Sequence, residues 1–178
     1  MSNRRRTVSI GLALVISGAV LGAQESIRIT PVVRDSQVLV SFELRDAYSP
    51  AVREAIASGL RTTFTYELEL RTVVPAWIDR TIARTTVTTS DLYDNLTRRH
   101  TLTRTVDGRV EEVTVTDDEA VVRSWLTQWN RVRVCDTSKL DATRDYYVYI
   151  TTRARPLGGS LLGLTKSISG QAKFTFIP

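Results

Sequence analysis

Few side chains in this chain of 178 residues could do acid–base or nucleophilic chemistry. His100 is the only histidine, and Cys135 is the only cysteine. A Ser-His-Asp relay would need His100 as its base, but no Gly-x-Ser-x-Gly sequence or comparable nucleophile context accompanies it. A metal site built from several histidines is excluded by composition. We therefore predict no catalytic residue, no cofactor, no metal site and no enzymatic activity.

Two pairs of neighbouring acids, Glu111-Glu112 and Asp117-Asp118, have the side chains that a glycosidase uses as acid and base. Their surroundings favour simpler roles. The first pair falls on an expected strand, where solvation accounts for it. The second falls at an expected helix start, where carboxylates interact favourably with the helix dipole.

Residue types that dominate protein–protein contacts occur in two short segments. Trp77, Asp79 and Arg80 lie in the first segment, and Arg98 and Arg99 lie in the second. An exposed indole desolvates well on binding, and guanidinium groups bind carboxylates bidentately. We take these five as the candidate interaction residues. The alternative is structural: Trp77 would fill the core, and Asp79 would pair with Arg80 or Arg98 across a hairpin.

The first 23 residues have the composition of a cleavable export signal. Three arginines precede an uncharged, mostly apolar run over 8–23, which is shorter than a typical spanning helix and is interrupted by glycine and serine. Small residues allow cleavage after Ala19 or after Ala23, and we favour the later site, which leaves Gln24 at the N-terminus. A leader kept as an anchor is the alternative. The predicted location is the periplasm or the medium.

Residues 24–178 then form a single domain of 155 residues, long enough to bury its own core. The formal net charge of +5 includes the three leader arginines, so this domain carries only +2. That small charge removes the main support for nucleic-acid binding. A lone cysteine cannot form an intrachain disulfide, and we expect Cys135 to be a small buried hydrophobic residue.

Alternating apolar and polar residues predict that most of this domain is β-sheet. The clearest alternation runs over 60–72, where four apolar residues share one face of an expected strand. These four residues are Phe64, Tyr66, Leu68 and Leu70. Further strands are expected over 27–33, 38–44, 132–135, 146–152 and 172–177 and within the threonine-rich region 81–116. Expected turns are Asp35-Ser36, Asp94-Asn95 and Asp107-Gly108.

Two short helices are expected to interrupt the strands. In the first, Ser49 caps the N-terminus, a proline follows in the first turn, and Gly59 ends the helix. The second begins with a capping box over 116–119 and continues through Trp125 and Trp129 at helical spacing. Its two indoles are expected to pack on the sheet. The predicted fold is mainly β: an antiparallel curled sheet or β-sandwich of about eight strands with two short helices.

Residues 156–170 differ in composition from the rest of the domain. They are rich in glycine and contain a leucine cluster, so we expect a loop. Its leucines could pack beneath the sandwich, or they could make peripheral contact with a membrane.

The two candidate segments also carry a family resemblance. Residues 77–80, residues 93–99 and the helix-glycine-strand passage 52–70 resemble the bacterial exported family of unknown function DUF4390. The chain departs from the family pattern at His100, where an aromatic residue is usual, and around Trp77, where several aromatic residues are usual. The resemblance implies an exported protein of unassigned activity, encoded in some genomes near a membrane sensor kinase.

Two functions from different classes are open at this point. We favour a non-catalytic interaction module of the bacterial envelope, whose partner is an envelope protein, with the outer domain of a sensor kinase as one candidate. The alternative is a binder of lipid or another apolar ligand, in a sandwich or partial barrel lined by the inward face of the strand over 60–72. An internal cavity would favour the second function, because a close-packed interior leaves no room for a ligand.

Overall fold

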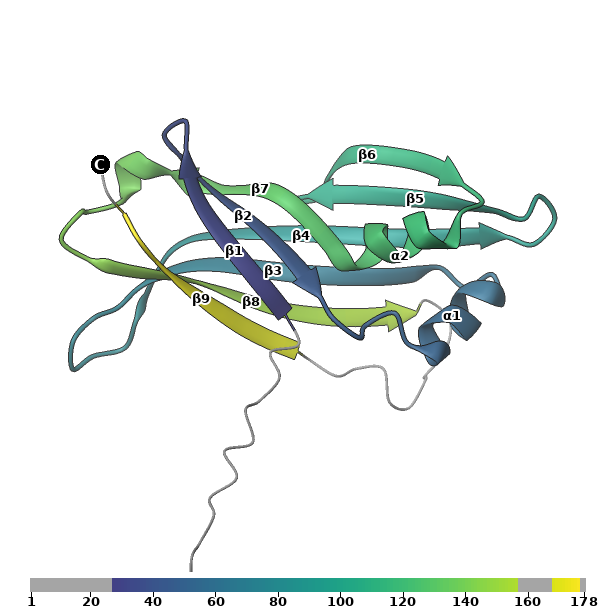
Figure 1. Ribbon diagram of the computed structural model, residues 1–178, viewed down its shortest axis with the longest axis horizontal. Coiled ribbons are helices and arrows are strands. Elements are labelled where there is room, and N and C mark those ends of the chain that lie inside the picture. The colour runs from purple at the N-terminus through teal and green to yellow at the C-terminus, as the bar shows by residue number, and fades with distance from the viewer. Residues whose placement is uncertain (1–26, 157–167, 177–178) are drawn as a thin grey trace, which may run out of the picture.

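The computed structural model describes residues 27–156 and 168–176, which form two antiparallel sheets packed as a sandwich (Figure 1). The smaller sheet has the strand order β1-β2-β7, and the larger has the order β6-β5-β4-β3-β8-β9. The strands are β1 (Ile27–Arg34), β2 (Gln37–Leu44), β3 (Thr62–Thr72), β4 (Arg80–Asp94), β5 (Arg99–Val106), β6 (Arg109–Thr116), β7 (Gln128–Asp136), β8 (Asp145–Pro156) and β9 (Ile168–Thr175). Neither sheet closes into a barrel. The predicted fold class is confirmed, with nine strands in the described residues.

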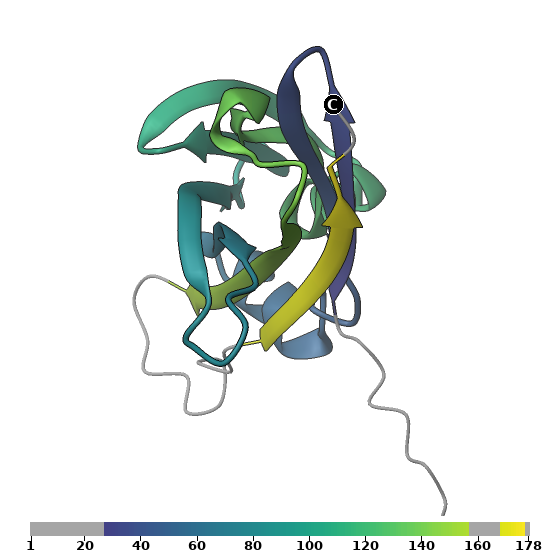
Figure 2. The same ribbon diagram turned by 90° about the vertical axis from the view of Figure 1, so that its left-hand side faces the viewer.

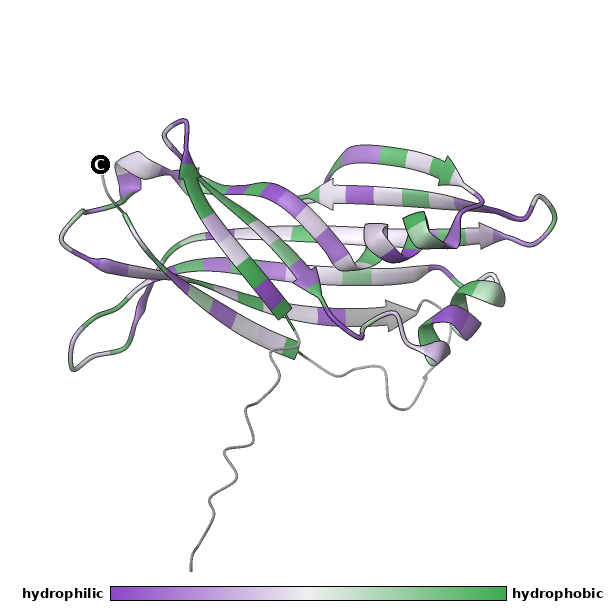
Figure 3. Ribbon diagram, in the orientation of Figure 1, coloured by the Kyte–Doolittle hydropathy of each residue, from purple (hydrophilic) through white to green (hydrophobic). Residues whose placement is uncertain are grey.

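Strand β3 lies at the centre of the larger sheet, between β4 and β8. Its predicted alternation is confirmed, since Phe64, Tyr66, Leu68 and Leu70 are at most 1% exposed. Figure 3 shows the same alternation of apolar and polar residues along neighbouring strands. The Tyr66 ring lies 4.8 Å from that of Phe42 on the opposite sheet, and the Tyr66 hydroxyl donates to the Leu126 carbonyl at 2.6 Å. The core therefore fills the space between the two sheets.

The two sheets approach each other along one side of the sandwich, where β1 runs beside β9 (Figure 2). A Cβ atom at Gly170 would stand 3.3 Å from the Cβ of Ile27. The backbone of Gly170 in β9 therefore packs directly against the side chain of Ile27 in β1. On the other side, β7 is the last strand of its sheet and has only β2 as a neighbour. That side of the sandwich is open.

Helix α1 (Pro50–Ala57) follows the prediction. The Ser49 side chain accepts a hydrogen bond from the backbone N–H of Val52, and Gly59, at φ 79°, ends the helix in the left-handed conformation that favours glycine. Helix α2 (Glu119–Thr127) is shorter than predicted. Its N-cap is Asp118, whose side chain accepts from the N–H of Ala120.

The prediction that Trp129 lies in the second helix is wrong. Gln128 already has extended dihedral angles, φ −126° and ψ 138°, and Trp129 pairs with Phe42 in the ladder between β2 and β7. Strand pairing therefore overrides the helical spacing of Trp125 and Trp129. This change puts the two indoles on different elements.

Two of the predicted turns have the geometry expected of two-residue hairpins. Asp35 and Ser36 have φ values of 50° and 57°, and Asp107 and Gly108 have 47° and 80°, as a type I′ turn requires. Strand β9 begins at Ile168, inside the range 156–170 that was expected to be a loop. Residues 157–167 of that range, like the leader over 1–23, lie outside the described residues. None of the helices that the structure describes is long and apolar enough to cross a bilayer.

Candidate functional site

The connection between β3 and β4, residues 73–79, presents two large apolar side chains to solvent. Trp77 is 80% exposed, and its neighbour Ile78 is 81% exposed. The alternative interpretation that Trp77 fills the core is therefore wrong. We call Trp77 and Ile78 the apolar tip.

Asp79 anchors this tip to the sheet. Its Oδ2 accepts a hydrogen bond from the Tyr147 hydroxyl at 2.7 Å, and its Oδ1 accepts one from the Val74 N–H at 3.2 Å. These two bonds hold the pKa of Asp79 below its usual range. Ala76, at φ 59°, turns the loop back toward β8, which carries Tyr147. The predicted pairing of Asp79 with Arg80 or Arg98 is wrong, because β8 lies beside β3 and brings a tyrosine to the carboxylate instead.

An ionic network lies next to this anchor, on the face of β3 that points away from the core. Arg71 Nε donates to one oxygen of Glu69 at 2.7 Å, and Arg84 Nε donates to the other at 2.9 Å. Burial disfavours the Glu69 carboxylate, but the hydrogen bonds from the two arginines outweigh it and lower the pKa of Glu69. Arg71 also lies over the Tyr149 ring at 4.5 Å and is the register partner of Tyr147. The apolar tip thus stands beside a fixed set of charges.

The structure does not bring the two candidate segments together. Arg80 begins β4 at the end near the apolar tip, whereas Arg98 and Arg99 follow the other end of that strand. At about 3.3 Å per residue, a strand of this length separates them by roughly 45 Å. The five candidate residues therefore do not form one contact surface, and the tip and the β4–β5 turn are separate sites.

Close to the β4–β5 turn, Asp91 of β4 and His100 of β5 form a histidine–carboxylate pair that the sequence did not reveal. Nδ1 of His100 lies 2.9 Å from Oδ2 of Asp91, and the imidazole is 4.5 Å from the Tyr93 ring. Burial raises the pKa of Asp91, and the hydrogen bond to His100 counters only part of that effect. The observed register makes the pair, because Tyr93 pairs with His100 and Asp91 lies two residues before Tyr93 on the same face of β4. The turn occupies residues 95–98, whereas the expected two-residue turn Asp94-Asn95 implied a different register.

A histidine hydrogen-bonded to a carboxylate supplies two of the three groups that a Ser-His-Asp relay needs. In the part of the chain that the structure describes, no hydroxyl or thiol hydrogen-bonds to the imidazole. His100 lines a surface groove of about 580 Å³, together with Arg53, Arg98 and Arg99. The absence of enzymatic activity stays a prediction.

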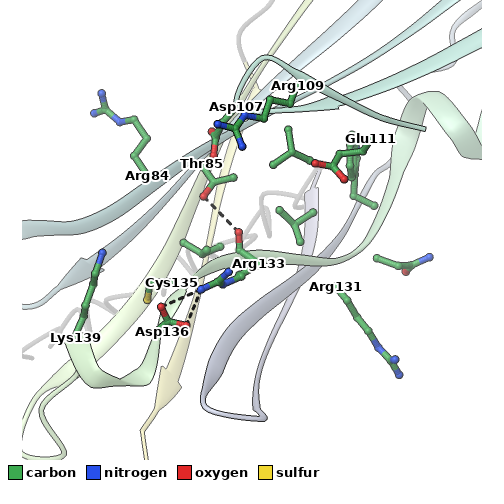
Figure 4. A pocket seen from close by; sticks show the side chains of 15 residues that line it. Arg84, Thr85, Asp107, Arg109, Glu111, Arg131, Arg133, Cys135, Asp136 and Lys139 are labelled. Carbon is green, nitrogen blue, oxygen red and sulfur yellow. Dashed lines mark hydrogen bonds and ion pairs between the residues drawn. The ribbon is translucent and has the colours of Figure 1, made fainter. Parts of the chain in front are cut away.

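A larger groove, of about 830 Å³, runs along β7 on the open side of the sandwich (Figure 4). Cationic side chains from three strands and from the 3₁₀ helix Thr137–Lys139 line it: Arg84, Arg109, Arg131, Arg133 and Lys139. Its carboxylates are Asp107, Glu111 and Asp136. We call this hollow the β7 groove. Sequence reasoning missed it, because its arginines are not grouped in the sequence and only the packing of the two sheets brings them together.

The fold and these sites can now be set beside known proteins. A family described as a domain of unknown function (DUF4390) matches residues 24–156, about three quarters of the chain. The chain belongs to the DUF4390 family. No curated protein and no solved structure matches it. In this DUF4390 protein the matched residues include the apolar tip, the β4–β5 turn and every residue that lines the β7 groove, the last of which is Lys139. Strand β9 lies beyond the matched residues.

Proposed function

We propose that this DUF4390 protein is an exported, non-catalytic interaction module that binds an envelope protein through the apolar tip. One observation carries the proposal: Trp77 and Ile78 are both about four-fifths exposed on a loop that Asp79 ties to β8. Large apolar side chains held in water gain free energy when a partner covers them. A loop that is already anchored loses little conformational entropy on binding.

The surroundings of the tip indicate what its partner offers. An apolar pocket would receive the indole, and charged groups at its rim would meet the ionic network around Glu69 and Arg71. The outer domain of a membrane sensor kinase is one candidate, because the family resemblance implies such a neighbour in some genomes. Export to the periplasm or the medium is supported by the signal-like composition of the leader. The family match also begins at residue 24, directly after the favoured cleavage site.

The same structure gives less support to an apolar-ligand binder. The inward residues of β3, which would line such a site, contact one another and the opposite sheet as ordinary core residues. The grooves at the β4–β5 turn and along β7 are open and carry charged side chains. We therefore propose the interaction module alone.

The test is a comparison of partner capture by two matched double variants. The protein is exported with its own leader and a C-terminal affinity tag, cross-linked in the intact envelope and quantified by mass spectrometry. Trp77→Ala with Ile78→Ala should reduce recovery of the main partner at least tenfold. Arg98→Ala with Arg99→Ala, at the far end of β4, should leave it within twofold of the unchanged protein.

Folding of each variant is checked by far-UV circular dichroism and the urea unfolding midpoint. Both pairs of side chains are exposed, so neither should shift the midpoint appreciably. Recovery of the same partners by the tip variant would contradict the proposal. Selective loss with the arginine variant would instead place the contact at the β4–β5 turn.

A further inference from the structure

Strand β7 has an edge that no strand covers within the described residues. Its ladder partner is β2, and its other edge faces β4 and β5 across the β7 groove. Side chains meet two of its carbonyls there: Arg104 Nη2 donates to the Gln128 oxygen at 2.7 Å, and the Thr85 hydroxyl stands 3.5 Å from the Arg133 oxygen (Figure 4). Apart from these two carbonyls, which already have donors, such an edge is a template on which another extended chain can pair.

The groove has the shape and lining that an extended chain needs. Val132 and Val134 are buried at its base, whereas Arg131 and Arg133, which alternate with them along β7, are exposed. The turn between β5 and β6 forms part of the opposite wall, through Asp107. A strand laid along β7 would point alternate side chains to the apolar base and to the cationic rim.

The charge of the rim favours an acidic occupant. Of its three carboxylates, Asp136 is paired, because Arg133 bonds to both of its oxygens at 2.8 and 2.9 Å. Asp107 accepts only the Thr86 N–H, at 2.8 Å, and Glu111 has no cation within 4.0 Å among the described residues, so both keep their negative charge. The cations Arg109, Arg131 and Lys139 have no carboxylate within 4.0 Å among the described residues. The five cations of the groove therefore outnumber its three carboxylates, and this excess of positive charge lies above an apolar base.

We infer that the free edge of β7 binds an extended acidic segment of a partner protein, which adds to β1-β2-β7 as a fourth strand. Apolar residues of the segment occupy the base beside Val132 and Val134, and its carboxylates meet Arg109, Arg131 and Lys139. This site is distinct from the apolar tip and does not depend on it. Main-chain hydrogen bonds supply affinity, and the rim charges select acidic sequences.

A synthetic probe tests the charge preference directly. A fluorescein-labelled decapeptide of alternating valine and glutamate is titrated with the full exported protein, and binding is followed by fluorescence anisotropy. We expect saturable binding that weakens as salt is added, and at least tenfold weaker binding of the valine–lysine peptide. No saturable binding, or equal binding of the two peptides, would overturn the inference.

Charge-reversal variants test the location. Arg131→Glu with Lys139→Glu should weaken binding at least tenfold, and Arg109→Glu on the opposite wall should weaken it independently. The matched control is Arg61→Glu with Arg153→Glu, which makes the same charge change at exposed positions outside the groove and should alter binding less than threefold. An equal loss of peptide affinity in the groove variant and in the control variant would show that only net charge matters, and it would overturn the assignment of the site to the β7 groove.

Hydrogen exchange tests the strand geometry. Bound peptide should slow exchange of backbone amides within 130–136, because that edge becomes hydrogen-bonded. Protection confined to β6, the free edge of the larger sheet, would overturn the assignment to β7. Trp77→Ala should bind the peptide as well as the unchanged protein, so failure of this inference and failure of the proposed function are distinguishable.

Discussion

The guanidinium carbon of Arg104 lies 4.2 Å from the centroid of the Trp125 ring, in the space between the two sheets. Its Nη2 donates to the carbonyls of Trp125 and Gln128, the residues that span the junction of α2 and β7. The same group lies 4.8 Å from the Trp129 ring. Burial lowers the pKa of Arg104, yet a guanidinium remains charged at neutral pH. One side chain thus joins β5 to the point where helix becomes strand.

Replacing Arg104 should therefore destabilise the fold. Arg104→Ala leaves the Gln128 carbonyl without its side-chain donor, leaves the Trp125 carbonyl only the Thr89 hydroxyl, and removes the cation–π contacts. We expect a loss of about 2–4 kcal/mol in the free energy of unfolding. Arg104→Lys should recover only part of it, because an ammonium cannot reproduce the planar fork. Urea unfolding measures both. Arg109→Ala, an exposed control, should change stability by less than about 0.5 kcal/mol, and equal midpoints for the two alanine variants would refute the role of Arg104.

The two faces of β3 should respond differently to truncation. Phe64→Ala should cost about 3–5 kcal/mol, because the side chain is fully buried and leaves a cavity. Glu67→Ala removes only a partly exposed ion pair with Arg84, worth about 0–1 kcal/mol. Denaturant midpoints compare the variants directly. Similar midpoints would mean that the inward and outward faces have been exchanged.

Asp79 should contribute stability that depends on pH. Its pKa is lower in the folded state than in the unfolded chain, so its contribution is complete above the ordinary aspartate pKa of about 4 and is lost as the pH falls through the lower folded-state value. We expect the stability gap between the unchanged protein and Asp79→Asn to narrow from pH 6 to pH 2. Thermal unfolding across this range measures the gap. A gap that is constant with pH would show that the carboxylate charge contributes nothing.

The leader prediction is tested by mass. If the signal is cleaved after Ala23, the exported protein should begin at Gln24 and lack the mass of residues 1–23. Intact-protein mass spectrometry of the periplasmic and medium fractions makes this measurement. A full-length species in the membrane fraction would support the retained anchor instead.

The sequence alone determined the features that depend on neighbouring residues. Alternation along β3 predicted its buried face, and the Asp107-Gly108 dipeptide predicted a two-residue turn. Ser49 and Gly59 marked the ends of α1. Each of these signals acts within a few residues, because backbone dihedral preferences and side-chain periodicity are local properties.

Tertiary structure decided how distant residues meet. Trp129 has helical spacing from Trp125, but its pairing with Phe42 places it in β7. Asp79 meets Tyr147 because β8 lies beside β3 in the larger sheet. The β7 groove exists because the smaller sheet ends at β7 and leaves one edge free. Strand order and sheet packing depend on the burial of the whole core, and no local sequence pattern encodes them. The sites that they create are therefore visible only in the tertiary structure.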